Sequence, residues 1–327
     1  MIRAFVTGGS GHVGGNLVRH LLDAGYEVRC LVRKDVRALD GLDVELVNGS
    51  LTDSTTLIQH MMDVDVVFHA AAFVAVEKSN EDLMRKINVG GTTAMVEAAL
   101  EANVPRFIHF SSVHAFSQRP TSEALTEERQ LVSNPKSAPY DQTKAAAQEI
   151  VYEACNHGLN ASIIHPTGII GPFDFKPSRM GQVLCDMANG KMPITINTGF
   201  NWVDVRDVCI AAINCIDQGK CGQHYIVPGQ WGSMKSLSDV VSSTIGRKTT
   251  RFTFPFWTAY LALPFAAIKS KITGKRPSFS RGSLHALAVQ CRDIPGSLAR
   301  DELDHHPRKL SETVRDTVEW MKTQGRI

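Results

Sequence analysis

Short apolar runs alternate with amphipathic stretches through the first half of the chain. In one such stretch Val13, Leu17 and Leu21 recur at helical spacing, and Gly25 follows as a C-terminal cap. A second helix is predicted from Asn88 to Ala102. The apolar runs predict strands at Ala4–Val6, Val28–Val32, Val44–Val47, Val64–His69, Phe107–Phe110 and Ala161–His165. Strands that alternate with helices predict an α/β fold, in which a doubly wound parallel sheet has helices on both faces.

The alternation of strands and helices fades after Pro172, in a stretch that is rich in Pro, Gly and Phe. The runs Trp202–Val208 and Tyr225–Val227 then resemble strands that return to the sheet. We therefore expect two interleaved parts. The larger domain comprises residues 1–170, with its sheet completed by about 201–230, and a smaller C-terminal lobe comprises 171–200 and 231–327.

The segment from Phe252 to Ile268 contains no charged residue and is interrupted by Pro255 and Pro264. It is too short for a comfortable membrane span. Basic residues flank it on both sides, namely Arg247, Lys248, Arg251, Lys269 and Lys271. We favour a buried helix, or one that covers a pocket, over contact with a membrane surface, which is the alternative.

The composition is that of an ordinary globular protein, with 43% hydrophobic and 21% charged residues. The net charge is +2 and no long cluster of Lys and Arg occurs, which argues against a general role in binding nucleic acid. Seven scattered cysteines favour reduced thiols over a disulfide framework or a zinc site, and we expect no metal. Because the first strand begins at residue 2, we expect no signal peptide and a cytoplasmic location.

Three glycines, Gly8, Gly11 and Gly14, lie between the first predicted strand and the first helix. Glycine at these positions allows a tight turn, close approach of the backbone to a phosphate, and close packing of helix on strand. The turn places backbone N–H groups at the positive end of a helix, where a pyrophosphate can bind. A turn without a ligand is the alternative for the motif alone, but its place on the first strand of an alternating pattern favours a dinucleotide site.

Tyr140 and Lys144 are four residues apart in a predicted helix and therefore share one of its faces. A neighbouring ammonium favours the phenolate, so we expect Lys144 to lower the pKa of Tyr140 and let it exchange a proton with a substrate oxygen. Ser112 ends a predicted strand that opens onto the ligand crevice. Its hydroxyl can donate a hydrogen bond to the same oxygen, with Ser111 as the nearby alternative.

With these residues in place, the chain resembles the extended short-chain dehydrogenase/reductase family, also called the NAD-dependent epimerase/dehydratase family. The family's motifs occur in order as Thr7-Gly8-x-x-Gly11-x-x-Gly14, His69-Ala70-Ala71-Ala72, Asn88-Val-Gly-Gly-Thr92, Ser112 with Tyr140 and Lys144, Pro166-Thr-Gly-Ile-Ile-Gly171-Pro172 and Val203-Asp-Val-Arg-Asp207. The resemblance implies a Rossmann-type doubly wound sheet with a smaller C-terminal substrate lobe. It also implies an enzyme in which Ser112, Tyr140 and Lys144 are catalytic.

Within that family, the run Val28-Arg-Cys-Leu-Val-Arg33 resembles the dihydroflavonol reductase branch. Members that prefer NAD place an acidic residue beside the ribose hydroxyls, whereas this chain has Arg33 followed by Lys34. A guanidinium can bind a 2′-phosphate that a carboxylate would repel, so we predict a preference for NADP(H), with NAD(H) as the alternative. The cofactor-binding residues implied by the resemblance are Gly8, Gly11, His12, Val13, Gly14, Arg33, Lys34, Ser50, Leu51, Ala70, Ala71, Ala72, Ser111, Tyr140, Lys144, Pro166 and Thr167.

Two positions depart from the family's pattern. Ser50 follows Gly49 where an Asp usually contacts the adenine, so that contact is weaker or comes from the backbone at Leu51. The usual Arg-Pro before the closing loop is His165-Pro166 in this chain. We expect His165 to be a packed, hydrogen-bonded residue and leave it out of the mechanism.

The substrate class follows from what the chain lacks. The sugar-nucleotide dehydratases have Asp-Glu after the catalytic hydroxyl, and this chain has Val113-His114, so dehydration is disfavoured. Epimerases of sugar nucleotides hold the diphosphate with an arginine where this chain has Phe200 or Asn201. A flat or hydrophobic substrate is favoured by aromatic residues in this part of the sequence, namely Phe173, Phe175, Phe200 and Trp202.

The leading hypothesis is an NADP(H)-dependent oxidoreductase that reduces a carbonyl group of a small hydrophobic substrate, or oxidises a secondary alcohol. One rival is a nucleotide-sugar epimerase that retains its cofactor tightly. Another is a redox sensor without catalysis, against which the Tyr140 and Lys144 pair argues. Relatives often form homodimers through the helices that follow the fourth and fifth strands, so a homodimer is one arrangement for this chain, and its oligomeric state is open.

Overall fold

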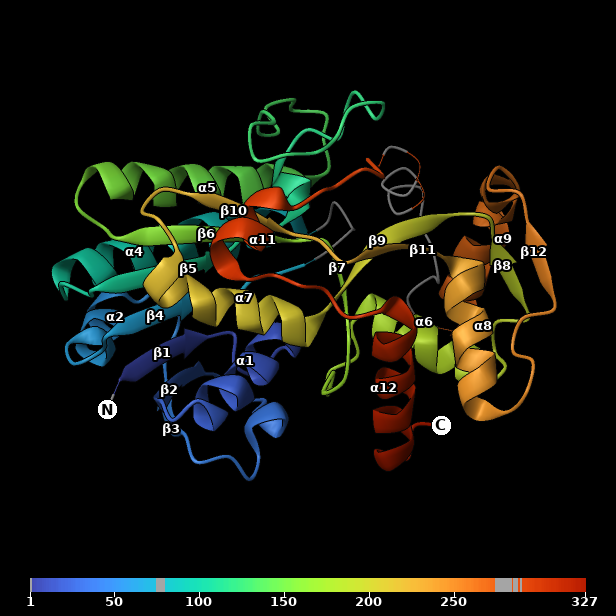
Figure 1. Ribbon diagram of the computed structural model, residues 1–327, viewed down its shortest axis with the longest axis horizontal. Coiled ribbons are helices and arrows are strands. Elements are labelled where there is room, and N and C mark those ends of the chain that lie inside the picture. The colour runs from blue at the N-terminus through green and yellow to red at the C-terminus, as the bar shows by residue number, and fades with distance from the viewer. Residues whose placement is uncertain (1, 75–79, 274–283, 285–287, 289) are drawn as a thin grey trace.

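The computed structural model describes residues 2–74, 80–273, 284, 288 and 290–327. Its centre is a seven-stranded sheet in the spatial order β10-β6-β5-β4-β1-β2-β3, in which neighbouring strands are parallel (Figure 1). The strands are β1 (Arg3–Thr7), β2 (Glu27–Val32), β3 (Glu45–Asn48), β4 (Val66–His69), β5 (Arg106–Phe110), β6 (Ala161–Pro166) and β10 (His224–Val227). The first six confirm the predicted strands to within two residues at each end.

Helices cover both faces of the large sheet, which confirms the doubly wound fold (Figure 1). Leu17 and Leu21 are fully buried in the core on one face, and Met95 and Val151 in the core on the other. The first face carries α1 (His12–Asp23), α7 (Val205–Gln218) and α11 (Ser297–Leu303), and the second carries α2 (Ser54–Met61), α4 (Gly91–Glu101) and α5 (Pro139–Asn156). A short helix α3 (Glu81–Arg85) and a π-helical turn, Lys86–Gly90, lead into α4.

Most of the elements beyond the sixth strand, apart from α7, β10 and α11, form a second group with its own core (Figure 1). Two small sheets have the orders β11-β9-β7 and β12-β8. Trp202, Leu237 and Val318 are among the residues that bury this core. The elements are β7 (Gly168–Ile170), α6 (Arg179–Ala188), β8 (Ile194–Ile196), β9 (Gly199–Asp204), β11 (Gln230–Ser233), α8 (Met234–Ile245), β12 (Phe252–Phe254), α9 (Thr258–Thr273) and α12 (Leu310–Thr323).

One of the two segments expected to rejoin the large sheet does so. Tyr225–Val227 belong to β10, which pairs with β6. The prediction for Trp202–Val208 was wrong, because Trp202 lies in β9, which pairs with β7 and β11, and Val205 begins α7. The partner strands β7 and β11 are short. A short apolar run such as β9 fits a strand of the large sheet and a strand of a small sheet equally well.

The apolar segment Phe252–Ile268 is not the buried helix that we favoured. It forms β12 and most of α9, and Phe252, Trp257 and Phe265 are exposed, whereas Ala259 is buried. Among the described residues, no helix is both long enough and apolar enough to cross a membrane. The pattern correctly predicted an apolar helix in this segment. It did not predict that several of the apolar side chains are exposed.

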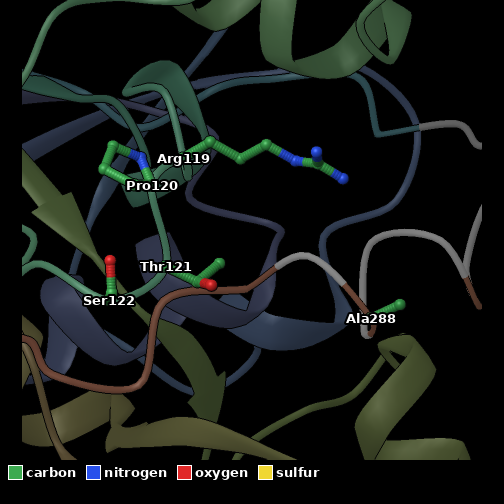
Figure 2. Close-up of a pocket in the computed structure, with 5 residues that line it drawn as sticks. All are labelled: Arg119, Pro120, Thr121, Ser122 and Ala288. Atoms are coloured by element: carbon green, nitrogen blue, oxygen red, sulfur yellow. The ribbon is translucent and has the colours of Figure 1, made fainter.

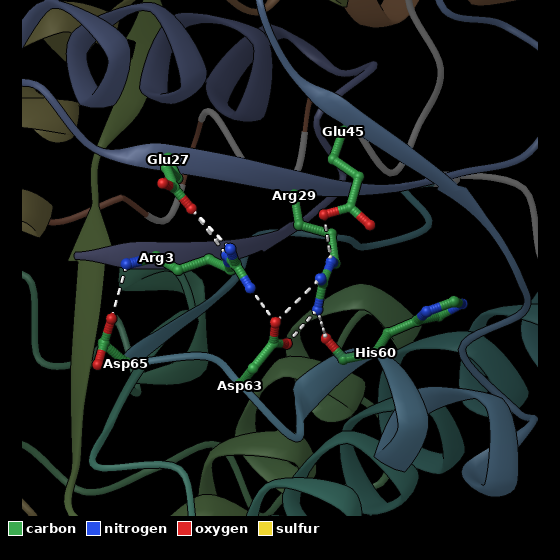
Figure 3. A network of polar contacts seen from close by, with 7 residues as sticks. All are labelled: Arg3, Glu27, Arg29, Glu45, His60, Asp63 and Asp65. Atoms are coloured by element: carbon green, nitrogen blue, oxygen red, sulfur yellow. Dashed lines mark hydrogen bonds and ion pairs between the residues drawn. The ribbon is translucent and has the colours of Figure 1, made fainter. Parts of the chain in front are cut away.

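An ion-pair network joins the amino ends of three strands in the large sheet (Figure 3). The Arg29 guanidinium on β2 lies 2.7 Å from Glu45 of β3 and 2.6 Å from Asp63 in the turn before β4. Arg3 on β1 pairs with Glu27, at 2.8 Å, and with Asp63. The network therefore lies at the amino ends of the strands, whereas ligands of such sheets bind at the carboxyl ends.

Candidate active site

The glycine turn between β1 and α1 is shaped by contacts that exclude side chains. Gly8 has a φ of +77°, and a Cβ atom there would lie 2.7 Å from the Ala71 nitrogen. A Cβ at Gly14 would lie 2.2 Å from the Gly8 oxygen, and the Gly11 N–H donates to that same oxygen at 2.8 Å. Gly11 is the N-cap of α1 and has no side chain to cover the helix terminus. These residues fit a dinucleotide, because an anion can approach the backbone N–H groups of this turn.

The segment after β4 lies against the glycine turn. Thr7 and His69 are register partners in β1 and β4, and their side chains are hydrogen-bonded at 2.8 Å. The Ala71 N–H donates to the Thr7 hydroxyl at 3.3 Å. Residues Ala70 and Ala72 flank this contact, so the structure brings the alanine run and the glycine turn together at the carboxyl ends of neighbouring strands.

Ser112, Tyr140 and Lys144 also converge at this edge of the sheet. Ser112 follows β5 and caps a short 3₁₀ turn, Val113–Ala115, through its hydroxyl, which accepts from the His114 N–H at 3.2 Å. Tyr140 lies in the first turn of α5, close enough to Ser112 for the serine hydroxyl to lower the pKa of the phenol. The buried Lys144 lies one turn further on and donates from Nζ to the Phe110 oxygen at 2.7 Å.

Ser111, the alternative to Ser112, points elsewhere. Its hydroxyl donates to the Gln148 side chain at 3.2 Å, and it is buried. Ser112 is thus the serine whose hydroxyl meets Tyr140. The difference follows from strand geometry, since successive side chains of an extended segment point to opposite sides.

The surroundings of Tyr140 do not produce the low pKa that we expected. Burial raises the pKa of Tyr140 to about 12, against a smaller lowering by the hydrogen bond from Ser112, and Asp141 raises it further. Burial also lowers the pKa of Lys144 to about 8. The pair is therefore a neutral phenol beside an ammonium that is easily deprotonated, and the phenol is in the form that donates a proton.

Asn88 in the π-helical turn before α4 connects the site to its neighbours. Its side chain accepts from the Phe73 N–H at 2.7 Å and donates to the Phe73 oxygen at 3.0 Å. It also donates to the Thr143 hydroxyl at 3.2 Å, next to Lys144 in the chain. Asn88 thus fixes the backbone after the alanine run relative to the helix that carries Tyr140, and π-helical turns often occur at functional sites.

His114 is a site residue that the sequence pattern did not indicate. In the sequence, its presence after Val113 served only as evidence against dehydration. Its ring lies 6.5 Å from the ring of Tyr140 and 5.8 Å from that of Phe200. Its Nδ1 atom is 3.7 Å from the Asp141 carboxylate. Its position two residues after Ser112 was the available signal. A partly exposed imidazole beside the phenol provides a second polar group that faces the same space.

Of the four aromatic residues expected at the substrate site, Phe200 is the one that contacts His114. Trp202 lies behind it with the ring centroids 5.2 Å apart. Phe173 and Phe175 instead pack against Trp320 of α12 and beneath the Arg19 guanidinium. The expectation that these two line the substrate site is not supported, because their rings complete the core of the C-terminal elements.

Three buried histidines, His69, His109 and His165, and the partly buried His224 lie near the site. His165 Nδ1 is 3.1 Å from the Ser112 backbone oxygen, and its Nε2 is 3.3 Å from His224. Burial lowers the pKa of His69, to about 3, and that of His109, His165 and His224 as well. The lowered pKa values favour neutral imidazoles, and His165 holds the Ser112 backbone, which agrees with leaving His165 out of the mechanism.

The residues predicted to contact the adenosine part of the cofactor lie further along the same edge. Arg33 and Lys34 directly follow β2 and are exposed. Arg33 makes no hydrogen bond or ion pair with another described residue, whereas Arg37 nearby is paired with Asp35 at 2.7 Å. The Ser50 hydroxyl is 2.9 Å from that of Thr52, and Leu51 follows it. The Arg33 guanidinium is therefore free to bind an anion.

Pro166 and Thr167 lie at the carboxyl end of β6. Thr167 is buried, and its hydroxyl accepts from the Gly229 N–H at 3.3 Å.

A separate surface pocket of about 620 Å³ is lined by Arg119, Pro120, Thr121, Ser122 and Ala288 (Figure 2). None of these five residues belongs to the catalytic or cofactor-binding set, so the candidate site rests on the convergence of polar groups at the strand ends.

Comparison with known proteins agrees with this arrangement. Residues 4–227 match the model of the NAD dependent epimerase/dehydratase family. The chain belongs to this family. The match covers the glycine turn, Ser112, Tyr140 and Lys144, and it ends with the last strand of the large sheet.

Two curated relatives align over almost the whole chain. Sterol demethylase protein B of Methylococcus capsulatus is 31% identical over 98% of this chain and 99% of its own. A putative dihydroflavonol 4-reductase of Synechocystis is 31% identical over 99% of this chain and 95% of its own. The resemblance to the dihydroflavonol reductase branch is thereby confirmed.

A solved structure has nearly the same fold. The crystal structure of gox2253 superposes with a TM-score of 0.86 at 30% identity and covers 100% of both chains. The Streptomyces venezuelae dTDP-glucose 4,6-dehydratase DesIV, solved with NAD, has a TM-score of 0.77 at 21% identity and shares the fold. This member of the epimerase/dehydratase family is thus an NAD(P)-dependent enzyme that acts on a small molecule.

Proposed function

We propose that this enzyme reduces a ketone of a hydrophobic substrate with NADPH, or catalyses the reverse oxidation of a secondary alcohol. The observation that carries the proposal is the placement of Tyr140 beside Ser112, whose hydroxyl acts on the phenol, one helical turn from Lys144. When bound, the nicotinamide supplies or accepts the hydride. The chain's own residues then have to polarise one oxygen and deliver one proton to it.

Tyr140 is the general acid in the direction of reduction. Its pKa of about 12 keeps the phenol protonated, so it can donate a proton to the oxygen as the carbonyl carbon receives a hydride. The Ser112 hydroxyl donates a hydrogen bond to the same oxygen and stabilises the developing negative charge. The Lys144 ammonium holds the nicotinamide ribose and favours the phenolate that remains after proton transfer.

Arg33 and Lys34 support a preference for NADP(H). Both are exposed at the end of β2, and the Arg33 guanidinium has no anionic partner among the described residues. It can bind a 2′-phosphate through two parallel hydrogen bonds. Equal values of kcat/KM for NADPH and NADH would contradict this preference.

A flat hydrophobic ketone fits the surroundings of the catalytic group best. The ring of Phe200, backed by Trp202, lies next to that of His114, which in turn lies beside Tyr140. The two relatives described above are named for sterol and dihydroflavonol chemistry, and a third, from Stigmatella aurantiaca, is named as a ketoreductase of a farnesyl dihydroquinoline oxide. That third relative is 30% identical over 80% of this chain.

The test is a screen of purified protein against sterol, flavonoid and quinoline ketones, with NADPH absorbance as the readout. We expect stoichiometric loss of NADPH and formation of the alcohol for at least one ketone class. An epimerase would instead retain bound cofactor through purification and convert a nucleotide sugar with no net consumption of NADPH. That result would overturn the proposed reaction.

Three coarser expectations remain part of the proposal. We propose that residues 171–200 and 231–327 form the substrate lobe around the dinucleotide-binding part. Two copies would associate through α4 and α5, as in relatives. A cytoplasmic location agrees with the seven cysteines, all of which are free thiols.

A further inference from the structure

Half of the large apolar side chains that are exposed in the described part of the chain lie on three neighbouring elements or in the turn that joins two of them. These elements are β8, β12 and α9, which lie together at the end of the molecule away from β1, β2 and β3 (Figure 1). We refer to the residues as the β12–α9 patch, which consists of Ile194, Phe252, Phe254, Trp257, Tyr260, Leu261 and Phe265. Such a concentration of exposed apolar surface indicates an interaction site.

Within each element, the backbone geometry groups these side chains. Leu261 and Phe265 are four residues apart on α9, and Trp257, in the turn just before the helix, extends this stripe, while Ala259 is buried at 4% exposure. The three side chains of the stripe are 63%, 64% and 74% exposed. On β12, Phe252 and Phe254 share a face, and Ile194 is the register partner of Phe252 in β8.

The charge of the surrounding sequence is strongly one-sided. Residues 240–292 contain nine of the chain's 35 Lys and Arg residues and none of its 33 Asp and Glu residues. The rest of the chain, with 26 basic against 33 acidic residues, therefore has a net charge of −7 although the whole chain has +2. Lys248 and Arg251 of this segment are exposed just before β12. An acid-free, basic segment thus carries the apolar patch.

We propose that the β12–α9 patch docks on the surface of a lipid bilayer that contains anionic phospholipids. Trp257 and Tyr260 have the amphipathic rings that favour the headgroup region, and Leu261 and Phe265 can enter the acyl boundary. The basic residues that flank the patch then face the negative lipid surface. Since no described helix can cross a membrane, the segment lies on the bilayer rather than in it.

The charge pattern favours a bilayer over a second copy of this chain. A symmetric dimer through the β12–α9 patch would place the same surface of both copies face to face. The basic segments of both copies, which include Lys248 and Arg251, would then be brought to the same interface. No acidic residue in 240–292 is present to neutralise their positive charge. This docking does not depend on the proposed reaction and can be tested without a substrate.

The experiment is co-sedimentation of the full chain with phosphatidylcholine vesicles, with and without about 30 mol % phosphatidylglycerol. We expect binding to the anionic vesicles. A triple variant, Trp257→Gln, Leu261→Gln and Phe265→Gln, should bind at least tenfold more weakly. So should a charge-reversal variant, Lys248→Glu with Arg251→Glu. Added salt should weaken binding of the parent.

Matched controls change the same numbers of exposed residues elsewhere. The apolar control is Met62→Gln, Leu83→Gln and Ile210→Gln, and the charge control is Arg85→Glu with Lys309→Glu. Both should sediment like the parent, and circular dichroism should show that every variant is folded. A parent that stays in the supernatant, or patch variants that sediment like it, would overturn the proposal. A dimer that the triple variant dissociates, without vesicle binding, would assign the patch to self-association instead.

Discussion

The hydroxyl group of Ser112 lies close enough to the Tyr140 phenol to lower its pKa, although the residues are 28 positions apart in the chain. The first follows a central strand and the second begins a helix that packs beside it. Neither residue is placed by its sequence neighbours alone. The parallel sheet brings them together, because the carboxyl ends of β4, β5 and β6 meet at one edge.

Ser112→Ala should lower kcat for ketone reduction by about 10²-fold to 10³-fold and leave KM for NADPH nearly unchanged. The reason is the loss of one hydrogen-bond donor to the developing oxyanion. Steady-state kinetics on a ketone substrate measures this effect. Ser111→Ala is the matched control, since its hydroxyl donates to Gln148 instead; as a predicted cofactor-binding residue it can affect KM for NADPH, but it should retain most of kcat. Equal losses of kcat in the two variants would contradict the assignment of the catalytic hydroxyl to Ser112.

In the reductive direction, kcat/KM should fall as pH rises above about 8. The pKa of Lys144 is lowered to about 8, so its ammonium is lost there, while Tyr140 with a pKa of about 12 stays protonated. The profile of kcat/KM reports groups of the free enzyme. Measurement between pH 6 and 10 should show one descending limb. A profile that stays flat to pH 10 would be inconsistent with this assignment.

The same shift predicts a pH-dependent difference in stability between the parent and Lys144→Met. The folded pKa of Lys144 is below its unfolded value of 10.5, so the unfolded parent binds more protons between these two pKa values and its stability rises with pH there. From pH 7 to 9.5 the parent should gain about 2 kcal/mol relative to the variant. Urea unfolding at both pH values measures this difference, and other groups cancel in the comparison. A constant difference would show that the Lys144 pKa is normal.

Arg33→Ser should lower kcat/KM for NADPH by at least tenfold and change kcat/KM for NADH little, because the lost guanidinium acts on the 2′-phosphate. Arg37→Ser is the matched control on the same exposed segment, and its guanidinium is already paired with Asp35. Kinetics with both cofactors separates the two variants. If Arg37→Ser changed the cofactor preference as much as Arg33→Ser, the assignment of Arg33 would be wrong.

Much of the fold could be predicted because its determinants are local. The apolar runs from Ala4 to His165 fixed six of the strands, and the spacing of Leu17 and Leu21 fixed the first helix. Because the strands are parallel, Gly8 after β1 and Ser112 after β5 must both lie at the edge of the sheet where the strands end. The identity of the site residues followed from their order along the chain.

Features that depend on burial were not predictable from the pattern. The pKa of Tyr140 is governed by how far its ring is removed from water, which outweighs its neighbours in the helix. The outward face of α9 could not be predicted either, because a helix that is apolar on all sides gives no indication of which face is buried. The contacts of Phe173 and Phe175 depend on α12, which lies more than 130 residues further along the chain.

The central claim is that the Tyr140 phenol donates the proton in a reduction driven by NADPH. Tyr140→Phe removes one oxygen atom and retains the ring, so it tests that claim most directly. For a ketone that the parent reduces, NADPH oxidation by the variant should fall by at least 10³-fold, while the Kd for NADPH, measured by fluorescence titration, should stay within about twofold. Turnover by Tyr140→Phe close to that of the parent would contradict the account.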